Sequence, residues 1–145
     1  MNEKLQLTIN DHASAEECAM IIGGLVSFND AAASPAHHRG LNVIAREDDL
    51  VVAGLLGFTN WNWLFIQQLW VAEGVRGQRI GAQLVAAAES EAAARGCTHA
   101  HVDTFGFQAL PFYQKLCYSI FGQLEDYPAG QRRYFLQKRE LASPA

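Results

Sequence analysis

The stretch that decides the fold runs from residue 66 to residue 96 and reads IQQLWVAEGVRGQRIGAQLVAAAESEAAARG. It begins as an apolar run typical of a strand, passes through a turn rich in glycine and arginine, and continues as an alanine-rich segment that predicts a long helix. Such a junction gathers backbone N–H groups and the positive end of the helix dipole at one point. The stretch therefore predicts a binding site for an anion such as a phosphate or pyrophosphate.

Length and composition restrict the class of protein. The 145 residues are half hydrophobic, which suits one compact domain with a sizeable core. We expect that domain to cover residues 1–140, with a frayed tail over residues 141–145. A formal net charge of −4 disfavours nucleic acid as a partner. Because no apolar run is long enough to span a bilayer and the first ten residues are polar and alternating, we expect no membrane partner and a cytoplasmic location.

Cysteine usage argues against disulfides and a structural metal site. The chain has three cysteines, Cys18, Cys97 and Cys117. They are odd in number, widely spaced and lack a C-x-x-C pair. Residues 97–103 read CTHAHVD, and strand alternation places Cys97, both histidines and Asp103 on one face. These are residue types that bind metals, but no second cluster complements them, so we expect a polar strip and no metal.

The order of predicted elements indicates a mixed α/β domain. Alternating residues 4–10 predict a half-buried strand, and capping residues at 11–14 predict a helix that reaches about Val26. Residues 28–40, which include Pro35, predict a short helical turn and a loop. The remaining predictions are strands over 41–47, 50–61, 61–71, 98–104, 118–126 and 132–140, and a short helix over about 108–116. The order β-α-(α)-β-β-β-α-β-α-β-β predicts a mostly antiparallel sheet flanked by helices.

Residues 76–81, RGQRIG, and residues 109–118, ALPFYQKLCY, resemble two motifs of the GNAT family of N-acetyltransferases. Residues 76–81 read RGQRIG and are similar to the family's acetyl-CoA signature, Gln/Arg-x-x-Gly-x-Gly/Ala, although Arg79 stands at the central glycine. Residues 109–118 read ALPFYQKLCY and resemble the family's A-x-x-F-Y-x-K-x-G-F segment, with Cys117 at the usual glycine. The spacing of the motifs extends the resemblance over nearly the whole chain. It implies the GNAT-like acyl-CoA N-acyltransferase fold.

The resemblance also implies acetyl-CoA as co-substrate and assigns residues to it. Backbone N–H groups of the turn would bind the pyrophosphate, and the edge of strand 69–71 would pair with the pantetheine arm. The Val71 N–H would polarise the thioester carbonyl. The implied cofactor-binding residues are Leu69, Trp70, Val71, Arg76, Gly77, Gln78, Arg79, Ile80, Gly81, Ala109 and Phe112. From the residues alone, the turn can equally be an ordinary basic helix start.

The catalytic half of the site depends on Tyr113. The resemblance implies that this phenol donates a proton to the departing CoA thiolate, and the alternative is a tyrosine packed in the core. Many family members carry a glutamate on the strand before the signature, but Gln67 and Gln68 stand there and cannot accept a proton. Asp103 is the best-placed carboxylate for a general base. A water relay without an essential base is the alternative.

The acceptor half of the site is the least specified by the sequence. Candidate substrate-binding residues are Phe28, Asn29, Trp61 and Trp63. We expect transfer of acetyl to a primary amine of a small molecule by direct attack in a ternary complex. Two alternatives stay open, a protein or peptide N-acetyltransferase and a CoA-binding sensor or interaction module with weak catalysis. Exposed edges of a mixed sheet also leave a homodimer open.

Overall fold

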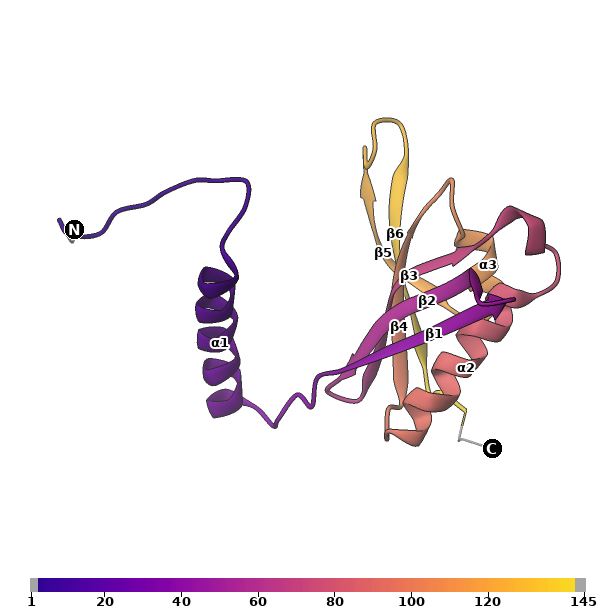
Figure 1. The fold of residues 1–145 in the computed structure, drawn as a ribbon, viewed down its shortest axis with the longest axis horizontal. Helices are drawn as coiled ribbons and strands as arrows, with labels where there is room; N and C mark the ends of the chain where they lie inside the picture. Colours follow the sequence, from indigo (N-terminus) through magenta and orange to yellow (C-terminus); the bar gives the residue numbers. More distant parts are fainter. Residues whose placement is uncertain (1–2, 143–145) are drawn as a thin grey trace. The chain divides into compact units, whose positions relative to one another are not determined.

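The structure, a computed structural model, describes residues 3–142 as two compact units, one ending at Ala36 and one beginning at His37 (Figure 1). The elements in chain order are α1 (Ala15–Ala32), β1 (Arg39–Glu47), β2 (Leu50–Asn60), β3 (Trp63–Val71), the 3-10 turn η1 (Glu73–Val75), α2 (Ile80–Ala94), β4 (His99–Phe105), α3 (Leu110–Lys115), β5 (Ser119–Glu125) and β6 (Arg132–Arg139). Of the predicted frayed tail, residues 143–145 lie outside the described residues. Leu141, the first residue of that tail, is held in the second unit by a hydrogen bond from its N–H to the Thr98 carbonyl at 2.7 Å.

The first unit contains α1, which is longer than the sequence predicted. A capping box opens it: Ser14 Oγ accepts from the Glu17 N–H at 3.0 Å, and the Ser14 N–H donates to Glu17 Oε1 at 2.8 Å. Because α1 continues to Ala32, Phe28 and Asn29 lie in the helix and not in the predicted turn. The predicted strand over residues 4–10 is wrong. In the described part of the chain no ladder pairs these residues, and alternation without a hydrogen-bonded neighbour makes no strand.

A six-stranded sheet in the order β1-β2-β3-β4-β6-β5 forms the framework of the second unit. Neighbouring strands are antiparallel except β3 and β4, which are parallel and joined by a crossover through α2. α2 covers one face of β1, β2 and β3 (Figure 1). It buries Leu84, Val85, Ala88 and Ala92 against that face. The predicted fold class, a mostly antiparallel sheet flanked by helices, is confirmed.

Arg95 fixes the C-terminal end of α2 to the first two strands. Its Nη1 donates to the carbonyls of Arg39 at 3.3 Å and Gly40 at 3.0 Å, and to Thr59 Oγ1 at 3.1 Å. Thr59 is only 4% exposed. The bond to Thr59 gives a buried hydroxyl a partner, and the three bonds together tie the end of α2 to β1 and β2.

A bulge in β3 opposite Gly57 opens the sheet at its centre. The pairing with β2 passes from Leu56 opposite Gln68 to Gly57 opposite Ile66, so Gln67 is an extra residue in β3. A Cβ at Gly57 would overlap the Phe65 carbonyl oxygen. On its other edge β3 pairs with β4 only from Trp63 to Ile66. The parallel pair therefore ends where the bulge begins.

We expect Gly57→Ala to destabilise the protein by about 3 kcal/mol, because the backbone of the bulge must move to accommodate the methyl group. Gly54→Ala, in the same strand, is the matched control: its Cβ would lie 3.5 Å from the Val43 carbonyl oxygen, an ordinary contact. Urea unfolding followed by circular dichroism compares the two variants. Equal unfolding free energies would show that the bulge does not need glycine.

Candidate active site

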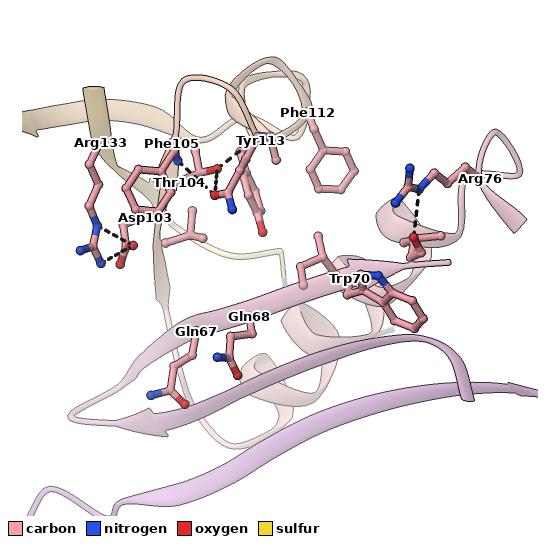
Figure 2. Close-up of a pocket in the computed structure, with 15 residues that line it drawn as sticks. Gln67, Gln68, Trp70, Arg76, Asp103, Thr104, Phe105, Phe112, Tyr113 and Arg133 are labelled. Atoms are coloured by element: carbon pink, nitrogen blue, oxygen red, sulfur yellow. Dashed lines mark hydrogen bonds and ion pairs between the residues drawn. The ribbon is translucent and has the colours of Figure 1, made fainter. Parts of the chain in front are cut away.

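The gap between β3 and β4 holds a cavity of about 810 Å³ (Figure 2). Its wall comes from the end of β3, the end of β4 and the start of α3. The lining residues are Gln67, Gln68, Leu69, Trp70, Val71, Arg76, Val102, Asp103, Thr104, Phe105, Gln108, Ala109, Phe112, Tyr113 and Arg133. The fold thus brings residues of the two separate sequence motifs to one cavity.

The free edge of β3 presents backbone groups to this cavity. The Ala72 N–H donates to the Val52 carbonyl at 2.8 Å. Hydrogen-bonded and non-hydrogen-bonded pairs alternate along an antiparallel ladder, so Val71, which opposes Ala53, directs its N–H and C=O away from β2. The carbonyl accepts a hydrogen bond from Arg76 Nε at 3.0 Å (Figure 2). The Val71 N–H points from the same edge toward the side where β4 has left the sheet.

A second hollow, of about 690 Å³, lies at the N-terminal end of α2. Val71, Arg76 and Phe112 line both hollows, so the two lie next to each other. The second hollow is also lined by four residues of the turn, Gly77, Arg79, Ile80 and Gly81. Gln78, in the same turn, lines neither hollow.

The first turn of α2 has the features of an anion-binding helix end. Its N-cap, Arg79, makes no side-chain cap, and the first turn carries no acidic residue. The first N–H groups of a helix have no acceptor within the helix, and they carry the positive end of its dipole. Gly81 lets the Phe112 ring pack closely against this helix end, since a Cβ there would lie 3.3 Å from the ring. Shape and partial charge both fit a phosphate group.

The two positions where the chain departs from the glycines of the GNAT motifs both have left-handed backbone. Arg79 has φ 61° and Cys117 has φ 72°. Glycine adopts this region without a penalty, whereas a residue with a Cβ is strained there by roughly 1–2 kcal/mol. The backbone of the motifs is therefore kept while the side chains differ.

We expect Cys117→Gly to raise the free energy of unfolding by about 1 kcal/mol, because glycine relieves the left-handed strain at the end of α3. Cys117 is exposed, so little packing is lost. Cys117→Ala is the control, since alanine keeps a Cβ and should bring no such gain. Thermal and urea unfolding measure both variants, and equal stabilities would contradict the strain.

A short helix places Tyr113 in the cavity wall. α3 has no side-chain cap from its own N-cap residue Ala109; instead the Ala109 N–H donates to Thr104 Oγ1 at 3.2 Å. Pro111 sits in the first turn, where its missing N–H costs nothing. Tyr113 is 3% exposed, and its hydroxyl is directed between β3 and β4 (Figure 2). Burial, followed by the negative charge of Asp103, raises the pKa of Tyr113 well above its usual value of 10.

Asp103 lines the cavity but is already paired. Its Oδ1 accepts hydrogen bonds from Arg133 Nε at 3.0 Å and Nη2 at 2.6 Å (Figure 2). Arg133 Nη1 donates to the Tyr127 hydroxyl at 3.0 Å, and the guanidinium lies 5.5 Å from the Phe105 ring centre and 5.1 Å from that of Tyr127. The bond to Asp103 raises the pKa of Arg133. This end of the cavity is therefore a charge pair framed by aromatic rings.

Of the predicted substrate residues, Trp61 and Trp63 belong to the second unit, and neither lines this cavity. Trp61 is in the tight β2–β3 turn, with φ 44°. Trp63 packs against His99 and His101, with ring centres 4.8 and 5.7 Å apart, and neither tryptophan lines the cavity. Phe28 and Asn29 belong to α1, in the first unit.

The strip predicted from residues 97–103 is polar and aromatic. Cys97 is buried before β4 begins, and the His101 ring stacks on Phe65 with centres 4.4 Å apart. Burial lowers the pKa of His101, so the neutral imidazole prevails near pH 7. Within residues 3–142, no group of three His, Cys, Asp or Glu side chains is arranged to hold a metal ion.

The sequence did not identify Arg133 as a residue of this site. Arg133 is thirty positions from Asp103 in the chain and meets it through the β4–β6 ladder, where Phe105 opposes Arg133. Two consecutive arginines on a predicted closing strand were the available signal. Only the register of that ladder tells which one faces the cavity.

Comparisons with known proteins agree with this geometry. The model of the Acetyltransferase (GNAT) family matches residues 10–117. An acetyltransferase of Agrobacterium fabrum is 38% identical over 93% of this chain and 99% of its own length. A crystal structure from Agrobacterium tumefaciens, also 38% identical, superposes with a TM-score of 0.88 over 93% of this chain and 99% of the other. Blasticidin-S acetyltransferase of Streptomyces morookaense is 39% identical over 61% of this chain and 65% of its own length.

The chain belongs to the GNAT family of acetyltransferases and is an acyltransferase enzyme. The resemblance that the two sequence motifs suggested is confirmed. No helix in residues 3–142 is long and apolar enough to cross a membrane.

Proposed function

We propose that this enzyme transfers an acetyl group from acetyl-CoA to a primary amine of a small molecule, with both substrates bound together. The observation that carries the proposal is that the two hollows lie next to each other and share Val71, Arg76 and Phe112 in their walls. An anion-binding helix end lies at one side and a buried phenol at the other. A ligand with a pyrophosphate, an extended arm and a reactive thioester matches that order.

The residues present fit acetyl-CoA at each part. The uncapped N-terminus of α2, with Gly77 and Gly81, would hold the pyrophosphate. The free edge of β3 over Leu69 and Val71 would bond to the amides of the pantetheine arm. Acetyl-CoA supplies the activated acyl group. The protein binds it, orients it and offers two hydrogen-bond donors to the reacting atoms, the Val71 N–H and the Tyr113 hydroxyl.

The chemical step is a direct acyl transfer. The neutral amine nitrogen bonds to the thioester carbonyl carbon, and the carbon–sulfur bond breaks with its electron pair left on sulfur. The Val71 N–H stabilises negative charge on the carbonyl oxygen as the bond forms. Tyr113 gives its proton to the sulfur and regains one from solvent. The nitrogen releases its extra proton to water, so no acyl group is attached to the enzyme.

We favour a chain of water molecules as the acceptor of the amine proton. Gln67 and Gln68 line the cavity but have no basic oxygen. Asp103 lines it too, yet protonation would weaken its charge-assisted bonds to Arg133. Release of the proton through water leaves that pair intact.

The experiment that tests this function is a thiol-release assay with acetyl-CoA over a panel of amines. Blasticidin S belongs on the panel because a relative bears the name blasticidin-S acetyltransferase. Polyamines, amino acids and aminoglycosides extend it to other small amines, and peptides with free N-termini or lysines test the protein-directed alternative. Turnover with a small amine, and none with peptides, is the expected result.

Binding is measured alongside turnover. Acetyl-CoA should raise the melting temperature, since it binds only the folded protein. Clear binding with background turnover over the whole panel would favour the sensor alternative. Stabilisation by nucleoside triphosphates but not by acetyl-CoA would overturn the assignment of the co-substrate.

A further inference from the structure

Behind the cavity wall lies a partly buried polar cluster that the proposed chemistry does not use. Tyr118, just after α3, is 2% exposed. Its hydroxyl donates to Glu89 Oε2, on α2, at 2.8 Å. Lys138 Nζ, on β6, donates to both oxygens of Glu89 at 3.0 and 3.2 Å. The cluster joins three elements that are distant in the sequence.

The cluster touches Tyr113 directly. The rings of Tyr113 and Tyr118 meet edge to face, with centres 5.7 Å apart and planes at 69°. The Tyr118 N–H also donates to the Tyr113 carbonyl at 3.0 Å. The Tyr113 ring also meets the Phe112 ring edge to face, with centres 5.0 Å apart. The aromatic position of Tyr113 is therefore set by two neighbouring rings, and one of those rings is anchored by a hydrogen bond.

That anchor is a departure from the GNAT motif quoted above, in which phenylalanine stands at the position of Tyr118. The extra hydroxyl needs an acceptor in a dry setting, and Glu89 provides one. Lys138 balances the charge of Glu89, whose side chain is 17% exposed. Burial and the Glu89 charge raise the pKa of Tyr118, so the hydroxyl stays protonated and remains a donor at working pH.

We infer that Tyr118 is a positioning residue: its bond to the Glu89–Lys138 pair holds the Tyr118 ring against Tyr113 and so fixes the Tyr113 hydroxyl at the cavity. The inference rests on the acid role proposed for Tyr113. α3 is a single short helix without a side-chain cap of its own, so it depends on such external contacts. Groups that act in a transition state lose efficiency with small displacements.

The test is Tyr118→Phe, which removes the hydroxyl and keeps the ring and the Glu89–Lys138 pair. We expect kcat to fall about 5- to 10-fold while KM for acetyl-CoA stays within about twofold. Thr59→Val is the matched control, because it removes a buried hydroxyl bonded to Arg95 away from the cavity. It should lower the melting temperature by a similar few degrees and leave kcat unchanged.

A double variant separates positioning from general stability. In a Tyr113→Phe background, where the acid hydroxyl is gone, adding Tyr118→Phe should cause no further loss of kcat. An undiminished loss in that background, or an equal loss in Thr59→Val, overturns the positioning role. If Tyr113→Phe alone leaves kcat unchanged, the acid role itself fails. If Tyr113→Phe lowers kcat and Tyr118→Phe does not, only the positioning inference fails.

Discussion

Replacing Gly81 by glutamate is expected to weaken acetyl-CoA binding by at least about 100-fold, or about 2.7 kcal/mol. Gly81 lies in the first turn of α2 and lines the second hollow, together with Val71 and Phe112. A carboxylate there would face the pyrophosphate across a few ångströms, and like charges at such distances repel by several kcal/mol. Isothermal titration with acetyl-CoA measures the loss.

The matched control for this substitution is Gly81→Ala. Its methyl group would meet the same Phe112 ring at 3.3 Å but adds no charge. A negative charge in the first turn of a helix is stabilising, so Gly81→Glu should remain folded. Similar losses of affinity in both variants would assign the effect to bulk. If Gly81→Glu bound acetyl-CoA with unaltered affinity, the proposed position of the pyrophosphate at the end of α2 would be wrong.

Replacing Tyr113 by phenylalanine is expected to lower kcat about 100-fold, the lower range for loss of a general acid, while the affinity for acetyl-CoA stays nearly unchanged. Phenylalanine keeps the ring contacts with Phe112 and Tyr118, so the fold of α3 is preserved. Steady-state kinetics and titration with acetyl-CoA separate the two effects. An unchanged kcat would show that the thiolate leaves without help from this phenol.

The pH dependence of the wild-type enzyme adds a second test of the same group. A general acid works only while it is protonated, and the pKa of Tyr113 is raised by burial and by Asp103. Ionisation of Tyr113 should therefore cause no fall in wild-type turnover below about pH 10, and Tyr113→Phe should leave that part of the pH profile unchanged in shape. A fall near pH 8 that disappears in the variant would contradict the raised pKa.

The sequence predicted the fold best where a pattern depends on local chemistry. Periodicity, glycine placement and two motifs at a fixed separation predicted the strands of the sheet, the turn before α2 and the start of α3 near Pro111. The capping residues before α1 were also correct, because Ser14 and Glu17 act within four residues of each other. The strand predicted over residues 4–10 was wrong, because alternation indicates which side chains a strand would bury but not whether a neighbouring strand pairs with it.

The cavity itself was less predictable, because it depends on registers between distant segments. Gly57 sets the bulge only through the Phe65 carbonyl, a contact that the spacing of residues does not reveal. Arg133 meets Asp103 only because β6 pairs with β4 in one particular register. Trp61 and Trp63 were both candidates for substrate contact, yet neither lines the cavity. Residue type marks candidates, and long-range pairing decides which of them meet.

If the proposed pyrophosphate site is right, the uncapped start of α2 makes the stability of the enzyme depend on how much co-substrate the cell contains. The N-cap residue of a helix often has a side chain that accepts a hydrogen bond from one of the first N–H groups, whereas the side chain of Arg79 makes no such bond in α2. A bound pyrophosphate would serve as the missing cap. At a concentration 100 times its dissociation constant, such a ligand adds about 2.7 kcal/mol to the free energy of unfolding. The enzyme would therefore be more stable against unfolding in a cell with a high concentration of the proposed co-substrate than in a cell with a low one.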